Sequence, residues 1–215
     1  MQRGDGGSSR TSGQALRSLP RCLAGRLSDD ADHLIGESDR RDMSEAKIDA
    51  GVRIGHVHLK VADLERSLRF YRDVLGFELT QRYGDSAAFV SAGGYHHHIG
   101  LNTWESKGGR APAAGTTGLF HVAIVYPTRA LLGDALQRLT RAGIQLDGAA
   151  DHGVSEALYL RDPDGNGVEL YWDRPREAWP KDEKDALSMF TRPLDLQGLL
   201  AEAESVPTTG SDSAR

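Results

Sequence analysis

Apolar and polar residues alternate along residues 53–61 (RIGHVHLKV), with the period of two that predicts a β-strand. Apolar residues then recur at helical spacing between Asp63, which is expected to cap a helix, and Gly76, which is expected to end it. Short runs separated by glycine-containing turns predict further strands at residues 78–83, 87–92 and 95–101. This part of the chain is therefore expected to fold as β-α-β-β-β.

The same order of elements recurs from residue 119. A predicted strand over residues 119–126 (LFHVAIVY) precedes a helix that begins after Thr128 and ends at Gly143. Strand candidates follow at residues 145–146, 157–161 and 168–172, and a strong turn signal, DPDGN, joins the last two. One β-α-β-β-β unit cannot bury both faces of its sheet, so two units must pair. The pattern predicts an α+β fold of two tandem β-α-β-β-β modules.

The two ends of the chain are polar and show little apolar periodicity. Residues 1–51 are expected to be disordered, because such a segment buries too little surface to offset its ordering entropy. Met43 is a candidate for the true start of translation. The expected divisions are a first module over 52–104, a linker over 105–117, a second module over 118–172, a C-terminal extension with a helix over 173–204 and a disordered tail over 205–215.

Composition narrows the class of protein. The chain has 215 residues, a formal net charge of −5 and one cysteine, Cys22, which excludes a disulfide framework and a Cys-rich zinc site. No apolar run reaches the roughly 20 residues of a transmembrane helix. The acidic charge balance argues against nucleic acid or an anionic membrane as the main partner. A cytoplasmic protein that binds neither nucleic acid nor a membrane is expected.

Three residues suggest a metal site. His56 and His121 occupy matching places in the first strands of the two modules, each on the face opposite the apolar residues. Glu169 lies between Val168 and Leu170 in the last strand, where an unpaired carboxylate would be costly to bury. Two imidazoles and one carboxylate from three strands suit a divalent metal and leave coordination positions open.

Three stretches carry a family resemblance: HVHLKVADLERSLRFYRDVLGF from His56, FHVAI around His121, and YLRDPDGNGVELYW from Tyr159. Together they resemble the vicinal-oxygen-chelate superfamily, which includes glyoxalase I, extradiol ring-cleaving dioxygenases and fosfomycin-modifying transferases. The last stretch is most similar to catechol 2,3-dioxygenase-like members. The resemblance implies modules whose sheets curl around one metal cleft, with His56, His121 and Glu169 as the metal ligands.

A run of three histidines bears on the reaction. Glyoxalase-like members carry a fourth metal ligand, a glutamate, on the last strand of the first module, whereas extradiol dioxygenases carry an acid–base histidine there. This chain has His96, His97 and His98 and no glutamate at that place. Strand alternation puts His97 on the face opposite the other two. The resemblance selects His98 as the acid–base residue, with His97 as the alternative.

Two further residues match the extradiol pattern. Tyr159 precedes Glu169 by ten residues, an offset at which extradiol enzymes carry a tyrosine that hydrogen-bonds the substrate oxygen. His152 lies just upstream, where those enzymes carry a second pocket histidine. The candidate substrate-lining residues are His58, Lys60, Phe89, Asn102 and Trp104.

The resemblance implies an extradiol ring-cleaving dioxygenase that acts on a catechol-like diol with O2, using Fe(II) or alternatively Mn(II). The second candidate is a glyoxalase-I-like isomerase, lyase or transferase acting on a small thiol adduct with Zn(II) or Ni(II). The third is a drug-binding resistance protein, which the complete triad disfavours because such members lack it. Well-known extradiol enzymes of this type carry four modules and this chain has two. A homodimer is compatible with paired modules.

Overall fold

The computed structural model describes residues 47–203. The alternative start at Met43, Cys22 and the tail over 205–215 lie outside these residues, as does most of the N-terminal segment that is expected to be disordered. Residues 47–53 belong to a separate N-terminal unit, in which the Asp49 carboxylate accepts a hydrogen bond from the Gly51 amide at 2.7 Å. The compact unit begins at Ile54.

The first module has the predicted order of elements. It comprises β1 (Val57–Lys60), α1 (Leu64–Leu68) continued by the π-helical η3 (Arg69–Val74), β2 (Glu78–Tyr83), β3 (Ala87–Ser91) and β4 (Ile99–Asn102). The strands form one sheet in the order β1-β4-β3-β2, with β1 parallel to β4. The Asp63 side chain caps α1 by accepting from the Arg66 amide at 2.9 Å, and Gly76 takes a left-handed φ of 88° after the helix.

The second module repeats this order. It comprises β5 (Val122–Val125), α2 (Arg129–Arg141), β6 (Leu146–Asp151), β7 (Ser155–Arg161) and β8 (Gly167–Asp173). The C-terminal extension adds η4 (Arg176–Ala178), β9 (Arg192–Pro193) and α3 (Leu196–Ala203). The second sheet has the order β5-β8-β7-β6-β9, so β9 extends it at the β6 edge. Among residues 47–203, no helix has the length and apolar character needed to cross a membrane.

The α+β class and the two-module order are confirmed, with two differences. The strands form separate sheets of four and five strands rather than one continuous curled sheet, with β1 and β5 each at an edge. The strand predicted over residues 95–101 begins only at Ile99, so the three histidines precede it. The side-chain alternation expected for that run therefore does not apply to it, because alternation requires extended strand geometry.

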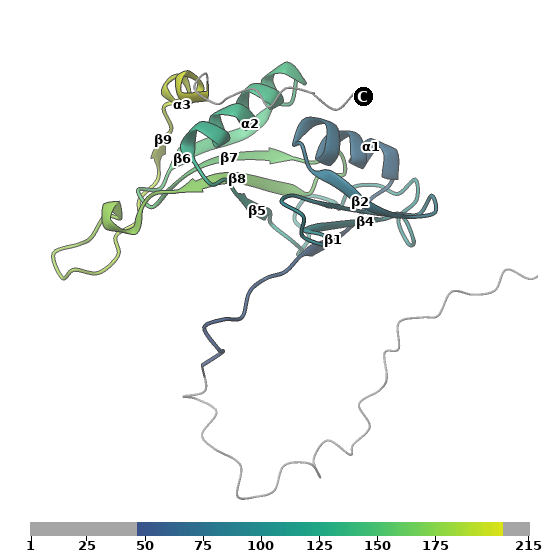
Figure 1. Ribbon diagram of the computed structural model, residues 1–215, viewed down its shortest axis with the longest axis horizontal. Helices are drawn as coiled ribbons and strands as arrows, with labels where there is room; N and C mark the ends of the chain where they lie inside the picture. The colour runs from purple at the N-terminus through teal and green to yellow at the C-terminus, as the bar shows by residue number, and fades with distance from the viewer. Residues whose placement is uncertain (1–46, 204–215) are drawn as a thin grey trace, which may run out of the picture. The chain divides into compact units, whose positions relative to one another are not determined.

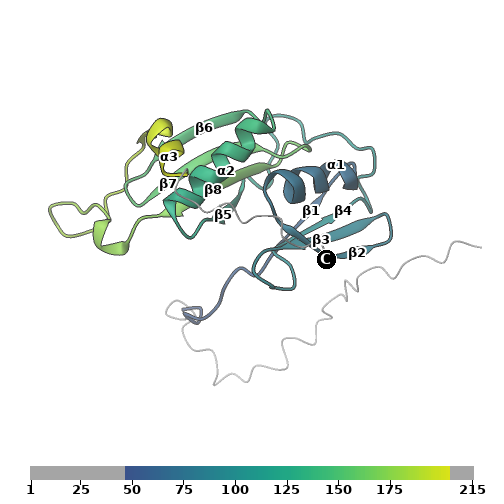
Figure 2. The same cartoon turned by 45° about the horizontal axis from the view of Figure 1, so that its top comes forward.

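Helices cover one face of both sheets (Figures 1 and 2). Apolar side chains of both modules join in one buried cluster, which includes Leu59 of β1, Val61 just after it, Leu139 of α2 and Leu170 of β8. Each buried leucine of this kind contributes about 2 kcal/mol to the stability of the fold. The opposite face of β1, which bears His58 and Lys60, is exposed, as the alternation predicts.

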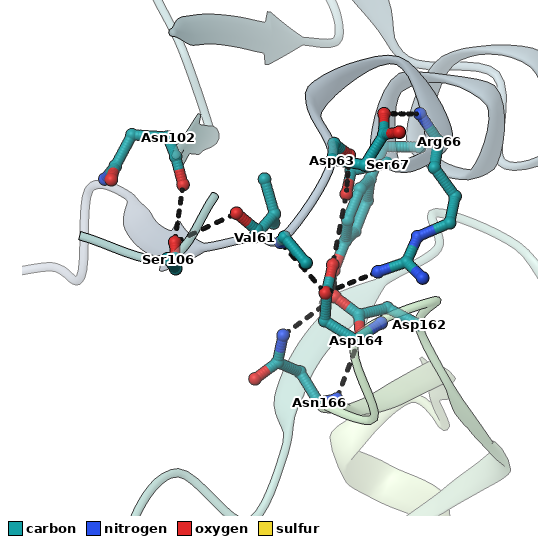
Figure 3. A network of polar contacts seen from close by, with 11 residues as sticks. Val61, Asp63, Arg66, Ser67, Asn102, Ser106, Asp162, Asp164 and Asn166 are labelled. Atoms are coloured by element: carbon teal, nitrogen blue, oxygen red, sulfur yellow. Dashed lines mark hydrogen bonds and ion pairs between the residues drawn. The ribbon is translucent and has the colours of Figure 1, made fainter. Parts of the chain in front are cut away.

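The turn between β7 and β8 joins the two modules. Asp164 accepts hydrogen bonds from the Ala62 amide at 3.0 Å, from Arg66 Nη2 at 2.5 Å and from Ser67 Oγ at 3.3 Å, all at the start of α1 (Figure 3). Asp162 is buried and accepts from the Tyr71 hydroxyl at 3.0 Å. The DPDGN turn therefore has two roles: it joins β7 to β8 within the second module, and its aspartates bind the start of α1 in the first module.

Close packing of α2 against α3 predicts the effect of one substitution. A Cβ atom added at Gly133 would lie 2.4 Å from the Leu199 carbonyl oxygen. Overpacking of this kind costs about 1–3 kcal/mol, against a gain in helix propensity of about 1 kcal/mol. We expect Gly133→Ala to lower the midpoint of denaturant unfolding. Gly148→Ala is the control, because nothing lies within 4 Å of the added Cβ; equal midpoints for the two variants would contradict the prediction.

Candidate active site

A line of polar contacts crosses the open face of the second sheet. Glu169 of β8 lies opposite Tyr159 of β7, and His121 lies just before β5. His121 Nε2 is 2.9 Å from Glu169 Oε2, and the Tyr159 hydroxyl donates to Glu169 Oε1 at 3.0 Å. His152 Nε2 is 2.8 Å from the same hydroxyl. Four of the predicted site residues, His121, Glu169, Tyr159 and His152, therefore form one connected group, which we call the second-sheet relay.

Strand register explains why the relay forms. The β7–β8 hairpin pairs Tyr159 with Glu169 directly across the ladder, and β5 pairs Ala123 with Glu169 on its other side. Residues directly opposite on one face of a ladder lie about 5 Å apart, which is within reach of these side chains. The neighbours Leu158 and Leu170 point to the helix-covered face and are fully buried, so Tyr159 and Glu169 face away from the helices.

Burial and charge fix the protonation of the tyrosine. Desolvation first, and then the adjacent Glu169 carboxylate, raise the pKa of Tyr159 to about 12. The Glu169 side chain is only 14% exposed. At neutral pH the Tyr159 hydroxyl therefore keeps its one proton and acts as a hydrogen-bond donor, with Glu169 Oε1 at 3.0 Å and His152 Nε2 at 2.8 Å both within reach.

The His121–Glu169 pair has the chemistry of a metal-binding edge. An imidazole nitrogen and a carboxylate oxygen, two donor types that divalent metals bind in proteins, lie 2.9 Å apart as His121 Nε2 and Glu169 Oε2. His121 Nδ1 is buried without a hydrogen-bond partner. In known metal sites that second nitrogen usually donates to a neighbouring group, and here it does not.

The third predicted ligand is not with this pair. His56 packs against His97, with ring centroids 4.4 Å apart, on the open face of the first sheet. Within residues 47–203, no three His, Cys, Asp or Glu side chains are grouped so that they could hold a metal ion. The predicted triad is therefore not assembled in this structure, and two of its members fit a metal while the third does not join them.

The histidine run divides between two environments. His97 lies beside His56 and Phe89, and burial together with the neighbouring histidines lowers the pKa of His97. His98 instead places Nδ1 2.9 Å from Ser91 Oγ and lines an apolar cavity of about 320 Å³ between β1 and β5. His56 lines the same cavity as His98, so both residues considered for the acid–base role lie near His56, and His97 is the one whose ring contacts it. His96 places Nδ1 2.7 Å from that of His97.

The predicted lining residues lie on the first module. His58 makes edge contacts with Trp104 at 5.5 Å and Phe89 at 5.8 Å, and burial, then the charge of His56, lowers the pKa of His58. Lys60 reaches Glu105 at 3.8 Å, and with His58 it lines a cavity of about 590 Å³ beside the linker.

Asn102 is buried, and its side-chain oxygen accepts from the Trp104 amide at 3.2 Å. This hydrogen bond joins Asn102 and Trp104, which are both predicted lining residues. Both belong to the end of β4 and the chain just after it, at the edge of the first module.

The residues around the relay include several that the sequence did not single out. A cavity of about 280 Å³ is lined by His121 and Tyr159 together with Phe120 and the Asp147–Arg161 ion pair. Period-two alternation places Arg161 on the same face as Tyr159, so strand register was a signal that could have found it. The contacts of His152 with the C-terminal extension had no sequence signal, because they join segments 38 residues apart.

The chain matches one protein-family model and several known proteins. The model of the Glyoxalase/Bleomycin resistance protein/Dioxygenase superfamily matches residues 53–170. A catechol-2,3-dioxygenase of Bacillus subtilis is 44% identical over 151 residues, which cover 70% of this chain and 52% of that protein. A biphenyl-2,3-diol 1,2-dioxygenase 3 of Rhodococcus globerulus is 34% identical over 135 residues, 62% of this chain and 68% of that protein.

A relative with a different name also matches. A probable lactoylglutathione lyase of Vibrio parahaemolyticus is 28% identical over 135 residues, which cover 59% of this chain and 94% of that protein. The chain thus spans about half of the Bacillus protein but nearly all of the Vibrio one. The paired β-α-β-β-β modules and the match over residues 53–170 establish that this chain belongs to the Glyoxalase/Bleomycin resistance protein/Dioxygenase superfamily.

Proposed function

We propose that this chain carries the active site of an extradiol ring-cleaving dioxygenase, which opens a catechol-like aromatic diol with O2. The observation that carries the proposal is the contact of Tyr159 with both Glu169 and His152, at 3.0 and 2.8 Å. A carboxylate, a protonated tyrosine and an imidazole in one line offer an anchor, a donor and a proton acceptor for a diol. The names of the two dioxygenase relatives support the same reaction class.

The chain's own residues have distinct tasks in this proposal. Tyr159, whose pKa is raised to about 12, donates a hydrogen bond and orients an oxygen of the substrate. His152 Nε2 accepts a proton as the diol binds, in place of His98 or His97, the residues for which the resemblance implied this role. A divalent metal such as iron or manganese would bind at His121 and Glu169, with His56 as the expected third ligand. The metal would supply the activation of O2 that no side chain provides.

Oxygen consumption tests the reaction directly. The full chain is prepared without oxygen, loaded with Fe(II) or Mn(II), and given catechol and a panel of substituted catechols in an oxygen-electrode cell. We expect oxygen uptake together with a coloured ring-fission product. Metal content is measured on the same samples, so that a lack of oxygen uptake is interpreted only for protein that contains metal.

A second class of reaction would give a different outcome. Binding of one metal per chain with no oxygen uptake on any diol would contradict the dioxygenase proposal. Turnover of a hemithioacetal of a small thiol with Zn(II) or Ni(II) would then favour the lyase class, which the name of the Vibrio relative suggests. Tight binding of a drug with neither activity would favour a resistance protein.

A further inference from the structure

Part of the C-terminal extension packs against His152. Residues 174–193, which we call the strap, leave the end of β8, project away from the second sheet and return as β9 beside β6 (Figure 1). The Arg174 amide donates to the Val154 carbonyl at 2.8 Å where the strap begins. At its other end, Arg192 and Pro193 pair with residues 150–151 of β6. Both ends of the strap are therefore fixed to the sheet that carries the relay.

The returning end of the strap contacts both the backbone and the ring of His152. The Phe190 amide donates to the His152 carbonyl at 3.3 Å. His152 Nδ1 lies 3.2 Å from the Phe190 carbonyl oxygen and 3.2 Å from Thr191 Oγ1. The Nδ1 side of the ring therefore meets the strap, while the Nε2 side meets Tyr159.

Packing holds Phe190 in this place. Its ring lies so close to Gly153 that a Cβ added there would be 2.6 Å from Phe190 Cε1, and Gly153 has a φ of 78° that favours glycine. The Arg192 guanidinium lies 4.2 Å from the centre of the Phe190 ring, which adds a cation–π contact. Only glycine after His152 leaves room for this ring, so the His152 loop and the strap interlock.

The contacts determine which nitrogen of a neutral His152 carries the proton. A backbone carbonyl can only accept a hydrogen bond, so the Phe190 oxygen requires a proton on Nδ1. Nε2 then keeps its lone pair and accepts the single Tyr159 hydroxyl proton at 2.8 Å, so in this form the hydroxyl directs that proton to His152 instead of to Glu169 Oε1 at 3.0 Å. The hydrogen bond on one ring nitrogen thus decides the chemistry available at the other.

We propose that the strap positions His152 for the reaction, with the Phe190 carbonyl and the Thr191 hydroxyl holding the imidazole as its Nδ1-protonated tautomer. Phe190 and Thr191 are positioning residues, because they act through His152 and touch none of the other relay residues. Nε2 is then the proton-accepting atom that faces the Tyr159–Glu169 pair. The catalytic meaning of this arrangement rests on the proposed function, whereas the tautomer itself does not.

Nitrogen NMR of the full chain with ¹⁵N-labelled histidine rings tests the tautomer without any assay of activity. The His152 signals are assigned by their loss in His152→Gln. In the unchanged protein we expect Nδ1 to show the shift of a protonated ring nitrogen and Nε2 that of an unprotonated one. A protonated Nε2 with an unprotonated Nδ1 would overturn the proposal.

Variants of the strap separate positioning from general stability. Phe190→Ala and Thr191→Val are expected to give a mixture of tautomers, and Thr191→Ser is expected to restore the original signals. Met189→Ala is the control, because Met189 is an exposed neighbour in the strap and its loss should change nothing. If Phe190→Ala does not fold, Thr191→Val and Thr191→Ser carry the test. Unchanged His152 signals in Thr191→Val would overturn a role for its hydroxyl.

Kinetics then connect the tautomer with the reaction. In the oxygen assay we expect Phe190→Ala to lower kcat about tenfold with little change in KM, since the proton acceptor is misplaced after the substrate has bound. The predicted tautomer in a protein that consumes no oxygen would support the positioning and reject the dioxygenase proposal. An active Phe190→Ala with mixed tautomers and an unchanged kcat would reject the catalytic role of the strap.

Discussion

Glu169→Gln is expected to reduce oxygen uptake by about a thousandfold or more, the scale at which removing a central group of an active site acts. The variant keeps the shape of the side chain and removes its negative charge. That charge faces His121 Nε2 at 2.9 Å and the Tyr159 hydroxyl at 3.0 Å, so both contacts are weakened together. Uptake is measured with the metal-loaded full chain, and metal content is determined in parallel.

The control for this variant is Glu78→Gln on β2, an exposed carboxylate of the first module. It is expected to retain the activity of the unchanged protein. Circular dichroism of both variants shows whether the fold is kept. If a folded Glu169→Gln variant kept more than a third of the activity, the reaction would not depend on the second-sheet relay.

Asp162→Ala is expected to destabilise the fold by about 3 kcal/mol or more, because it leaves several buried hydrogen-bond donors without their acceptor and each such donor costs about 1–3 kcal/mol. Asp162 Oδ1 accepts from the amides of Asp164 and Asn166, each at 2.9 Å. Oδ2 accepts from the Tyr71 hydroxyl at 3.0 Å, and Tyr71 is fully buried. The substitution leaves that hydroxyl without a partner, which alone costs about 1–3 kcal/mol.

Asp182→Ala provides a matched control in the same chain. Asp182 also closes a turn, accepting from the Lys184 amide at 2.8 Å and the Ala186 amide at 2.9 Å, but it is exposed. Its loss is expected to cost about 1 kcal/mol or less. Denaturant unfolding measures both variants; equal losses would mean that burial of the β7–β8 turn against α1 adds nothing to its stability.

Turn signals and strand alternation in the sequence indicate which strands pair and which way side chains point within each module. The turn signal DPDGN centres a hairpin, and its symmetry puts Tyr159 directly opposite Glu169, ten residues later. Alternation alone placed His56 opposite the apolar face of its strand. These predictions succeed because side-chain direction in a strand repeats every two residues, whatever the rest of the fold does.

The histidine run shows where a local pattern fails. Alternation assigned opposite faces to His97 and His98 on the assumption that the strand already includes them. The strand begins at Ile99 instead, and His97 turns toward His56 while His98 binds Ser91. The start of a strand depends on which neighbours it pairs with, and those neighbours are far away in sequence.

The sequence by itself determined the two modules, the faces expected for His56, His121 and Glu169, and the turn whose symmetry sets Tyr159 opposite Glu169. Tertiary structure alone decided that His121 meets Glu169 while His56 lies with His97, and that Phe190 reaches His152. The physical reason is the range of the forces involved. Backbone geometry and hydrogen-bond ladders act over a few residues, whereas the placement of one module or one strap against another depends on packing among distant segments.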